Sequence, residues 1–205
     1  MTRAFEELFA IPDAFRGIPM AGRTDAWILS DAAVAHGIPA GSSGLGQFPQ
    51  IYAQHLEREL GHPGPRKGLM PGVRELLDRL ARCDGAYLAL LTGNYEAGAK
   101  LKLEYFDLWR YFRCGAFGDD APDRNGLLPK AVARAAACGG PAVATSEAIV
   151  IGDTPLDIAC AAAGGARSIG VATGSHSVSQ LRDAGADVVF GDLADTDAVL
   201  AALGL

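Results

Sequence analysis

The chain has 205 residues, of which 49% are hydrophobic and 20% charged, a composition typical of a globular protein with one core or a core and a small attached subdomain. The formal net charge of −6 argues against nucleic acid and an anionic membrane surface as main partners, because both select clustered Lys and Arg. No apolar run reaches the roughly 18 residues of a membrane-spanning helix. The sequence shows no signal-peptide pattern and no Cys-x-x-Cys pair, so we expect a reduced, cytoplasmic protein without zinc.

From Arg3 to Leu60 the pattern is helical. Apolar residues recur at spacings of three and four, first at Phe5, Leu8 and Phe9 and later from Phe48 to Leu56. The Gly-, Ser- and Pro-rich stretch 36–46 predicts a loop, and Gly61–Gly72 predicts a linker. No strand is predicted before Tyr87, and we therefore predict a helical subdomain over residues 1–66.

After the linker, predicted strands and helices alternate. This order predicts an α/β fold over residues 67–205, with a Rossmann-like parallel sheet and helices on both faces. Strands are expected at 86–92, 114–118, 148–153, 168–173 and 186–190, and helices at 73–83, 96–106, 127–137, 155–165, 177–185 and 196–205.

Polar residues follow the ends of four predicted strands: Thr92–Asn94, Gly118–Asp120, Asp153–Thr154 and Thr173–Ser175. Ligands of such sheets bind beyond the carboxyl ends of the strands, so we expect these segments to converge.

Two of these strand ends carry chemistry. Asp153 and Asp157 lie four residues apart, and crowded carboxylates favour a cation such as Mg²⁺ between them and an anion. The Thr92 hydroxyl and the backbone N–H groups after it are suited to hold a phosphate oxygen. The alternative for both is that Thr92, and Asp153 or Thr154, only cap the helices that follow.

Together these residues carry a family resemblance. "LLTGN" at Leu90–Asn94 and "IGDTPLD" at Ile151–Asp157 resemble the second and fourth motifs of the haloacid dehalogenase (HAD) superfamily, most of whose members are Mg²⁺-dependent phosphatases. The helical start resembles the cap subdomain of this superfamily, and "MAGRTD" at Met20–Asp25 is similar to cap segments of its phosphoglycolate phosphatase-like branch. The likeness covers nearly the whole chain.

The resemblance implies a role for each matching residue. Thr92 would hydrogen-bond the transferring phosphoryl group, and Gly93 and Asn94 would contact phosphate. Asp153 would bind Mg²⁺, with Asp157 supporting it directly or through water. The implied reaction is hydrolysis of a small phosphate monoester. We expect the partner to be a small phosphorylated metabolite and the protein to be a monomer or a homodimer.

The first motif of the superfamily is not found. That motif is an apolar strand ending in Asp-x-Asp, whose first Asp becomes an aspartyl phosphate and whose second is the general acid and base. No apolar strand runs directly into such a pair, and Asp119-Asp120 follows a different strand. A truncated sequence, a wrong start site and a real loss of the motif are all open. We expect the chain as given to be inactive; the alternative is a non-catalytic HAD-fold protein that binds a phosphorylated ligand or a protein partner.

The third motif, a basic residue that neutralises phosphate, has three candidates. Lys102 is preferred, followed by Arg124 and then Lys130, and each has the alternative of a solvated surface charge. Arg23 is a candidate cap contact that would clamp a carboxylate or phosphate, and its alternative is a salt bridge with Asp25 or another nearby acid.

Two other classes are weaker. A flavodoxin-like or nucleotide-binding domain lacks the expected G-x-G-x-x-G fingerprint, and a haloacid dehalogenase proper would need the same first Asp.

Overall fold

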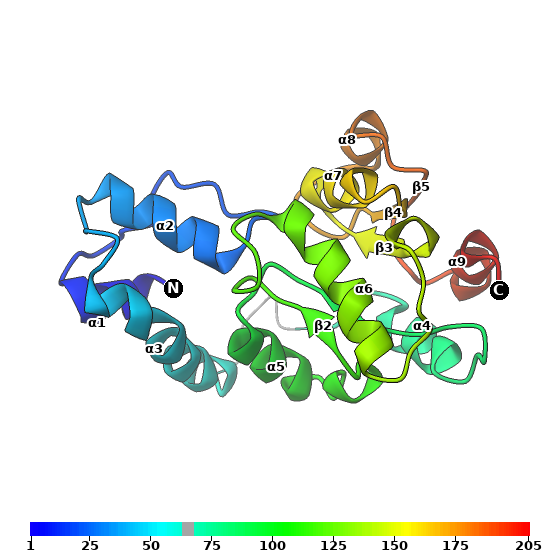
Figure 1. Ribbon diagram of the computed structural model, residues 1–205, viewed down its shortest axis with the longest axis horizontal. Coiled ribbons are helices and arrows are strands. Elements are labelled where there is room, and N and C mark those ends of the chain that lie inside the picture. The colour runs from blue at the N-terminus through cyan, green and yellow to red at the C-terminus, as the bar shows by residue number, and fades with distance from the viewer. Residues whose placement is uncertain (63–67) are drawn as a thin grey trace.

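The computed structural model describes residues 1–62 and 68–205, which form a helical part and an α/β part (Figure 1). The helical part contains α1 (Thr2–Phe9), α2 (Asp25–Ala35) and α3 (Ser43–Leu60). The prediction of helices without a strand before Tyr87 is confirmed for the described residues. The boundary at residue 66 lies among residues 63–67, outside the described part of the chain, so the exact division stays a prediction.

An aromatic cluster holds the helical part together. Phe5 and Phe48 are both 0% exposed, and the Phe5 ring lies 5.5 Å from Phe15 and 6.3 Å from Phe48, measured between centroids. Edge-to-face aromatic pairs of this kind add to the stabilisation from burial alone. Tyr95 of the α/β part belongs to the same cluster, and α3 packs against α5 (Glu96–Tyr105). The two parts therefore share a packed contact.

The α/β part confirms the predicted alternation. Its other helices are α4 (Val73–Leu80), α6 (Leu127–Ala137), α7 (Pro155–Ala163), α8 (Val178–Asp183) and α9 (Thr196–Leu203), and its strands are β1 (Leu90–Leu91), β2 (Gly115–Ala116), β3 (Ile149–Gly152), β4 (Arg167–Val171) and β5 (Val188–Phe190). No helix among the described residues has the length and apolar character needed to cross a membrane.

The strands form two parallel ladders. β1 pairs with β2, with Leu90 opposite Gly115, and β3, β4 and β5 pair in that order, with Ile151 opposite Ile169. Among the described residues no ladder joins β1 to β3, so each has one open edge. Ile151 on β3 is 39% exposed, which is unusual for a large apolar residue in such a sheet. The run 86–92 contributes only a two-residue strand, shorter than predicted.

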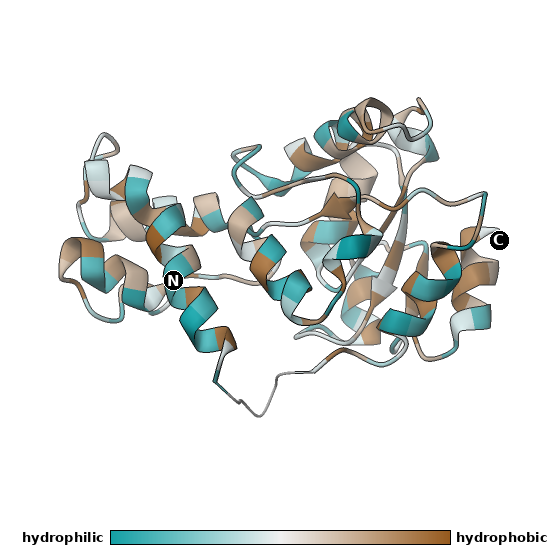
Figure 2. Ribbon diagram, turned by 90° about the horizontal axis from the view of Figure 1, so that it is seen from below, coloured by the Kyte–Doolittle hydropathy of each residue, from teal (hydrophilic) through white to brown (hydrophobic). Residues whose placement is uncertain are grey.

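Helix α6 connects the two ladders. It packs against β1, β2 and α7, and its residue Leu128 shares one apolar cluster with Leu91 of β1 and Val150 of β3. A separate cluster joins α4 and α9 to Leu88 and Phe190. Helices therefore cover both sides of the strands, and in Figure 2 several of them carry one hydrophobic and one hydrophilic side.

Candidate active site

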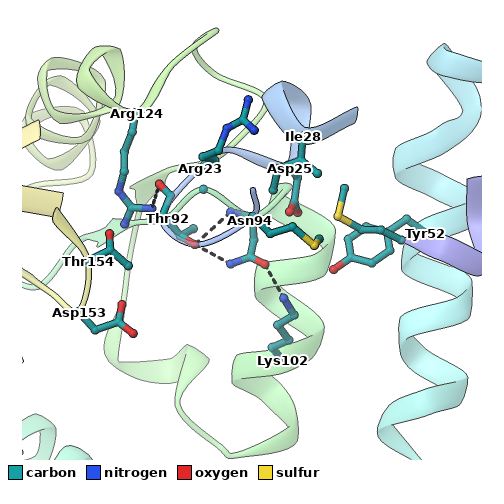
Figure 3. Close-up of a pocket in the computed structure, with 14 residues that line it drawn as sticks. Arg23, Asp25, Ile28, Tyr52, Thr92, Asn94, Lys102, Arg124, Asp153 and Thr154 are labelled. Atoms are coloured by element: carbon teal, nitrogen blue, oxygen red, sulfur yellow. Dashed lines mark hydrogen bonds between the residues drawn. The ribbon is translucent and has the colours of Figure 1, made fainter. Parts of the chain in front are cut away.

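A cavity of about 370 Å³ lies where the helical part meets the strand ends. Figure 3 shows that its side chains come from both parts of the molecule. The lining residues include Met20, Gly22, Arg23, Asp25, Thr92, Gly93, Asn94, Lys102, Arg124, Asp153 and Thr154. The predicted phosphate residues and Asp153 therefore share one cavity, although β1 and β3 are not hydrogen-bonded neighbours.

The other two strand ends, at Gly118 and Gly174, contact residues that line this cavity. The Gly118 N–H donates to the Asn94 carbonyl at 2.7 Å, and a Cβ on Gly118 would lie 1.9 Å from the Gly93 oxygen. A Cβ on Gly174 would lie 2.1 Å from Asp153 Oδ2. Gly118 is thus required by close backbone approach, Gly174 leaves room for the Asp153 carboxylate, and the predicted convergence of the four strand ends is confirmed. Asp120 instead pairs with Arg134.

The Thr92 hydroxyl has a fixed direction. Its Oγ1 accepts from the Asn94 backbone N–H at 3.2 Å and from Asn94 Nδ2 at 2.8 Å. A hydroxyl has two lone pairs and one hydrogen, so these contacts leave its O–H to donate elsewhere. Since Thr92 lines the cavity, its O–H is suited to a hydrogen-bond acceptor there, such as a phosphate oxygen.

Lys102 determines the orientation of the Asn94 amide. Its ammonium donates to Asn94 Oδ1 (Figure 3), and because an ammonium only donates, Oδ1 must face it and Nδ2 must face Thr92. Burial lowers the pKa of Lys102, and the nearby carboxylate of Asp25 acts in the opposite direction. Lys102 is thus a half-buried cation of the cavity and not a solvated surface charge.

Asp153 is the carboxylate that opens onto the cavity. It is exposed on that side. Partial burial of the carboxyl group nevertheless raises the pKa of Asp153, and the negative charge of Asp157 raises it further. No ion pair joins Asp153 to a cation in the described part of the chain. A carboxylate held against another acid fits a position beside a cation.

Asp157 is engaged on both oxygens. Oδ2 accepts from the Thr154 N–H at 3.0 Å and from the Thr154 hydroxyl at 2.8 Å, while Oδ1 accepts from Arg124. Asp157 is 3% exposed and belongs to the first turn of α7, where an acid is favoured by the helix dipole. Its direct contacts therefore hold Thr154 and Arg124 in place behind Asp153.

Two arginines line the cavity with their guanidinium groups held by other residues. Arg124 donates to the Gly22 carbonyl at 3.0 Å and to Asp157. Arg23 donates to Asp31 at 2.6 Å, and its guanidinium lies 4.0 Å from the centre of the Trp27 ring. The buried Nε of each arginine has no hydrogen-bond partner among the described residues.

Asp25 is the contact that sequence reasoning missed. It is 7% exposed; its backbone N–H donates to the Gly93 carbonyl at 2.6 Å, and its Oδ2 accepts from the Tyr95 N–H at 2.9 Å. Burial raises the pKa of Asp25, and the Tyr95 N–H opposes that shift. Asp25, one of the acids considered as a partner of Arg23, instead contacts the turn after Thr92. The two residues of this hydrogen bond are 70 positions apart, so no local sequence pattern predicts it.

The cavity offers one carboxylate that suits Mg²⁺ as a ligand. Mg²⁺ usually takes one or two carboxylates and completes its shell with water and substrate oxygens, and Asp153 supplies one such carboxylate. No cluster of three or more His, Cys, Asp or Glu suited to a metal occurs among residues 1–62 and 68–205. Asp195-Thr196-Asp197, an Asp-x-Asp sequence, lies elsewhere: Asp195 caps α9 and Asp197 pairs with Arg79.

Comparison with known proteins identifies the family. The haloacid dehalogenase-like hydrolase model matches residues 14–162, more than half of the chain, and a HAD-hydrolase-like model matches residues 127–201. The chain is 27% identical over 150 residues to a "probable phosphoglycolate phosphatase" of Pseudomonas putida. That match covers 73% of this chain and 55% of the relative, so the chain spans little more than half of the relative's length.

Solved structures share the fold. A hydrolase from Pseudomonas syringae matches with a TM-score of 0.66 and 22% identity, covering 98% of this chain and 90% of that one. A predicted phosphoglycolate phosphatase from Haemophilus somnus matches with a TM-score of 0.66 and 17% identity, covering 97% and 88%. These likenesses show the shared fold. The chain belongs to the haloacid dehalogenase-like hydrolase family.

Proposed function

We propose that this cavity binds the phosphoryl group of a small phosphate monoester beside Mg²⁺, as part of a phosphohydrolase that acts through an aspartyl phosphate. The observation that carries the proposal is the pairing of two complementary groups in one cavity. Thr92 offers a hydroxyl whose oxygen already accepts twice from Asn94, so that its O–H is left to donate, and Asp153 offers a carboxylate with no ion-pair partner among the described residues. A phosphate oxygen suits the first and a divalent cation suits the second.

The charges around the cavity support an anionic substrate. Lys102, Arg124 and Arg23 line it together with the carboxylates of Asp25 and Asp153. A divalent cation at Asp153 would make the sum strongly positive and would attract a phosphate dianion. The volume of about 370 Å³ lies near the lower end of the roughly 300–1,000 Å³ found for small-molecule sites, which favours a small metabolite.

Each residue would act by binding or orienting. Thr92 and the backbone of Gly93 would hold phosphoryl oxygens, with Asn94 keeping the Thr92 hydroxyl in place. Lys102 and Arg124 would offset the phosphate charge, and Arg23 would meet the rest of the substrate from the helical part. Mg²⁺ at Asp153, with Asp157 supporting the site, would polarise a phosphoryl oxygen when bound.

Hydrolysis through an aspartyl phosphate needs a nucleophilic Asp carboxylate, which we do not assign to any residue of this chain. Of the two carboxylates that line the cavity in its described part, Asp25 is tied to Tyr95 and Asp153 is the candidate metal ligand. We therefore propose that residues 1–205 alone bind phosphate and Mg²⁺ without turnover. The same observation favours a second candidate function, a non-catalytic member of the family that binds a phosphorylated ligand or a protein partner.

The ligand class, location and oligomeric state are also proposed. A negatively charged protein of this kind would act on a cytoplasmic metabolite, as a monomer or homodimer, and not on nucleic acid or a membrane surface.

Titration calorimetry with inorganic phosphate, with and without Mg²⁺, tests the binding site. Thr92→Val and Asp153→Asn should each weaken Mg²⁺-dependent phosphate binding about tenfold or more. Thr2→Val and Asp183→Asn change an exposed residue of each type outside the cavity and should leave binding unchanged. Equal affinity in all four variants would contradict the site, and Mg²⁺-dependent release of p-nitrophenol from p-nitrophenyl phosphate would contradict the proposed lack of turnover.

A further inference from the structure

The helical part is fastened to the phosphate-binding turn at one buried residue, Asp25. Two hydrogen bonds run in opposite directions: the Asp25 N–H donates to Gly93 O at 2.6 Å, and the Asp25 carboxylate accepts from Tyr95 N–H at 2.9 Å. Thr24 and Tyr95 beside them are 0% and 4% exposed. Neither bond competes with bulk water, so both fix the backbone where they form.

The fit at this joint is tight. A Cβ on Gly93 would lie 2.3 Å from the Arg23 carbonyl oxygen. A Cβ on Gly22 would lie 2.4 Å from Thr154 Oγ1, and the Gly22 carbonyl accepts from Arg124. The segment 22–25 therefore touches the ends of both β1 and β3.

The Asp25 carboxylate also stands at the start of α5. Tyr95 is the residue before the first turn of this helix, and no side chain of its own caps it. A carboxylate that accepts the N–H at this point satisfies a donor and complements the positive end of the helix dipole. The start of α5, the helix that carries Lys102 in its last turn, is thus held by a residue of the helical part.

We propose that Asp25 is a positioning residue. It fixes the turn 93–95 so that the Asn94 amide and the Thr92 hydroxyl keep their direction, and it holds Arg23 over the same cavity. The role in ligand binding rests on the proposed function, whereas the fastening of the two parts does not.

Two substitutions separate the hydrogen bond from the charge. Asp25→Ala removes the acceptor for Tyr95, whereas Asp25→Asn keeps an amide oxygen that accepts the same N–H and removes only the negative charge. Asp187→Ala is the matched control, because the Asp187 carboxylate likewise accepts a backbone N–H, that of Ser168 at 2.7 Å, away from the cavity.

Amide hydrogen exchange on residues 1–205, followed by titration with inorganic phosphate and Mg²⁺, tests the proposal. Asp25→Ala should reduce protection at Tyr95 and over residues 22–25 about tenfold or more and weaken phosphate binding by a similar factor, with protection of α2 and α3 retained. Asp25→Asn should restore both properties in large part. Asp187→Ala should reduce protection at Ser168 only.

Unchanged protection at Tyr95 in Asp25→Ala would overturn the proposal, and so would lost protection with wild-type phosphate affinity. If Asp25→Ala does not fold, Asp25→Asn tests the proposal instead. Wild-type protection and wild-type phosphate affinity in Asp25→Asn would support the proposal, and loss of either would overturn it. If the unmodified chain binds no phosphate, the proposed function fails and the exchange at Tyr95 alone decides whether Asp25 fastens the two parts.

Discussion

The hydroxyl of Thr92 and the ammonium of Lys102 are connected through one amide. Lys102 donates to Asn94 Oδ1, and Asn94 Nδ2 donates to Thr92 Oγ1 at 2.8 Å. A cation ten residues along the chain therefore determines in which direction the threonine proton points. If the cavity binds phosphate as proposed, we expect Lys102 to affect binding through this connection without touching the ligand.

Replacing Lys102 by Met should weaken inorganic phosphate binding about tenfold, because the Asn94 amide loses the contact that orients it. Lys100→Met is the matched control: Lys100 lies on the same helix, is exposed and forms an ion pair with Glu104. Calorimetric titration of both variants makes the comparison. Equal loss in the two would show a general charge effect instead.

Replacing Asp153 by Asn should stabilise the metal-free chain at neutral pH. Burial and then Asp157 raise the pKa of Asp153, so the carboxyl favours the folded state below its ordinary pKa of 3.8, and this contribution is lost as pH rises through the raised value. Urea midpoints of both proteins in EDTA should diverge with rising pH, and Mg²⁺ should raise only the wild-type midpoint. Parallel midpoints across the range would contradict this account.

Two glycine substitutions should have opposite effects. Gly93→Ala forces a Cβ to within 2.3 Å of the Arg23 carbonyl and should cost about 1–3 kcal/mol, as overpacked sites do. Gly46→Ala lies inside α3 with open space around the new atom and should gain about 0.5–1 kcal/mol from helix propensity. Urea unfolding measures both, and a stable Gly93→Ala would show that the joint can relax.

Asp187 should contribute to acid sensitivity. The backbone N–H of Ser168 and then its hydroxyl lower the pKa of Asp187. The resulting stabilisation is complete above the ordinary pKa of 3.8 and is lost as pH falls through the lowered value. The unfolding free energy of Asp187→Asn should therefore depend less steeply on pH below about 4, which chemical denaturation at a series of pH values would detect.

Much of the α/β part could be predicted because its signals are local. Helix α6 occupies the predicted 127–137, and α7 begins at the predicted Pro155. Thr92 and Asp153 were identified because each directly follows an apolar run, and the sheet brings the ends of such runs together. The length of β1 was overestimated, since the apolar pattern of residues 86–92 does not reveal on how many sides a strand is paired.

The joint around Asp25 could not be predicted in the same way. Its partners, Gly93 and Tyr95, lie in another part of the chain, and the segment that contains it reads as an ordinary helix start. Likewise α3 packs against α5, the helix that carries Lys102, and periodicity alone does not specify this contact. Contacts between parts of a chain carry no fixed spacing, so they are found only in three dimensions.

The division of the strands into two ladders has a consequence for the cooperativity of melting. No backbone hydrogen bond of a ladder links β1 to β3 in the described chain, so the two halves of the α/β part are connected by side-chain packing, around Leu128 of α6 and in the cluster that joins α4 and α9 to Leu88 and Phe190. Truncating Leu128 should then broaden a single calorimetric transition or split it into two, while a comparable truncation within one half would merely lower its temperature.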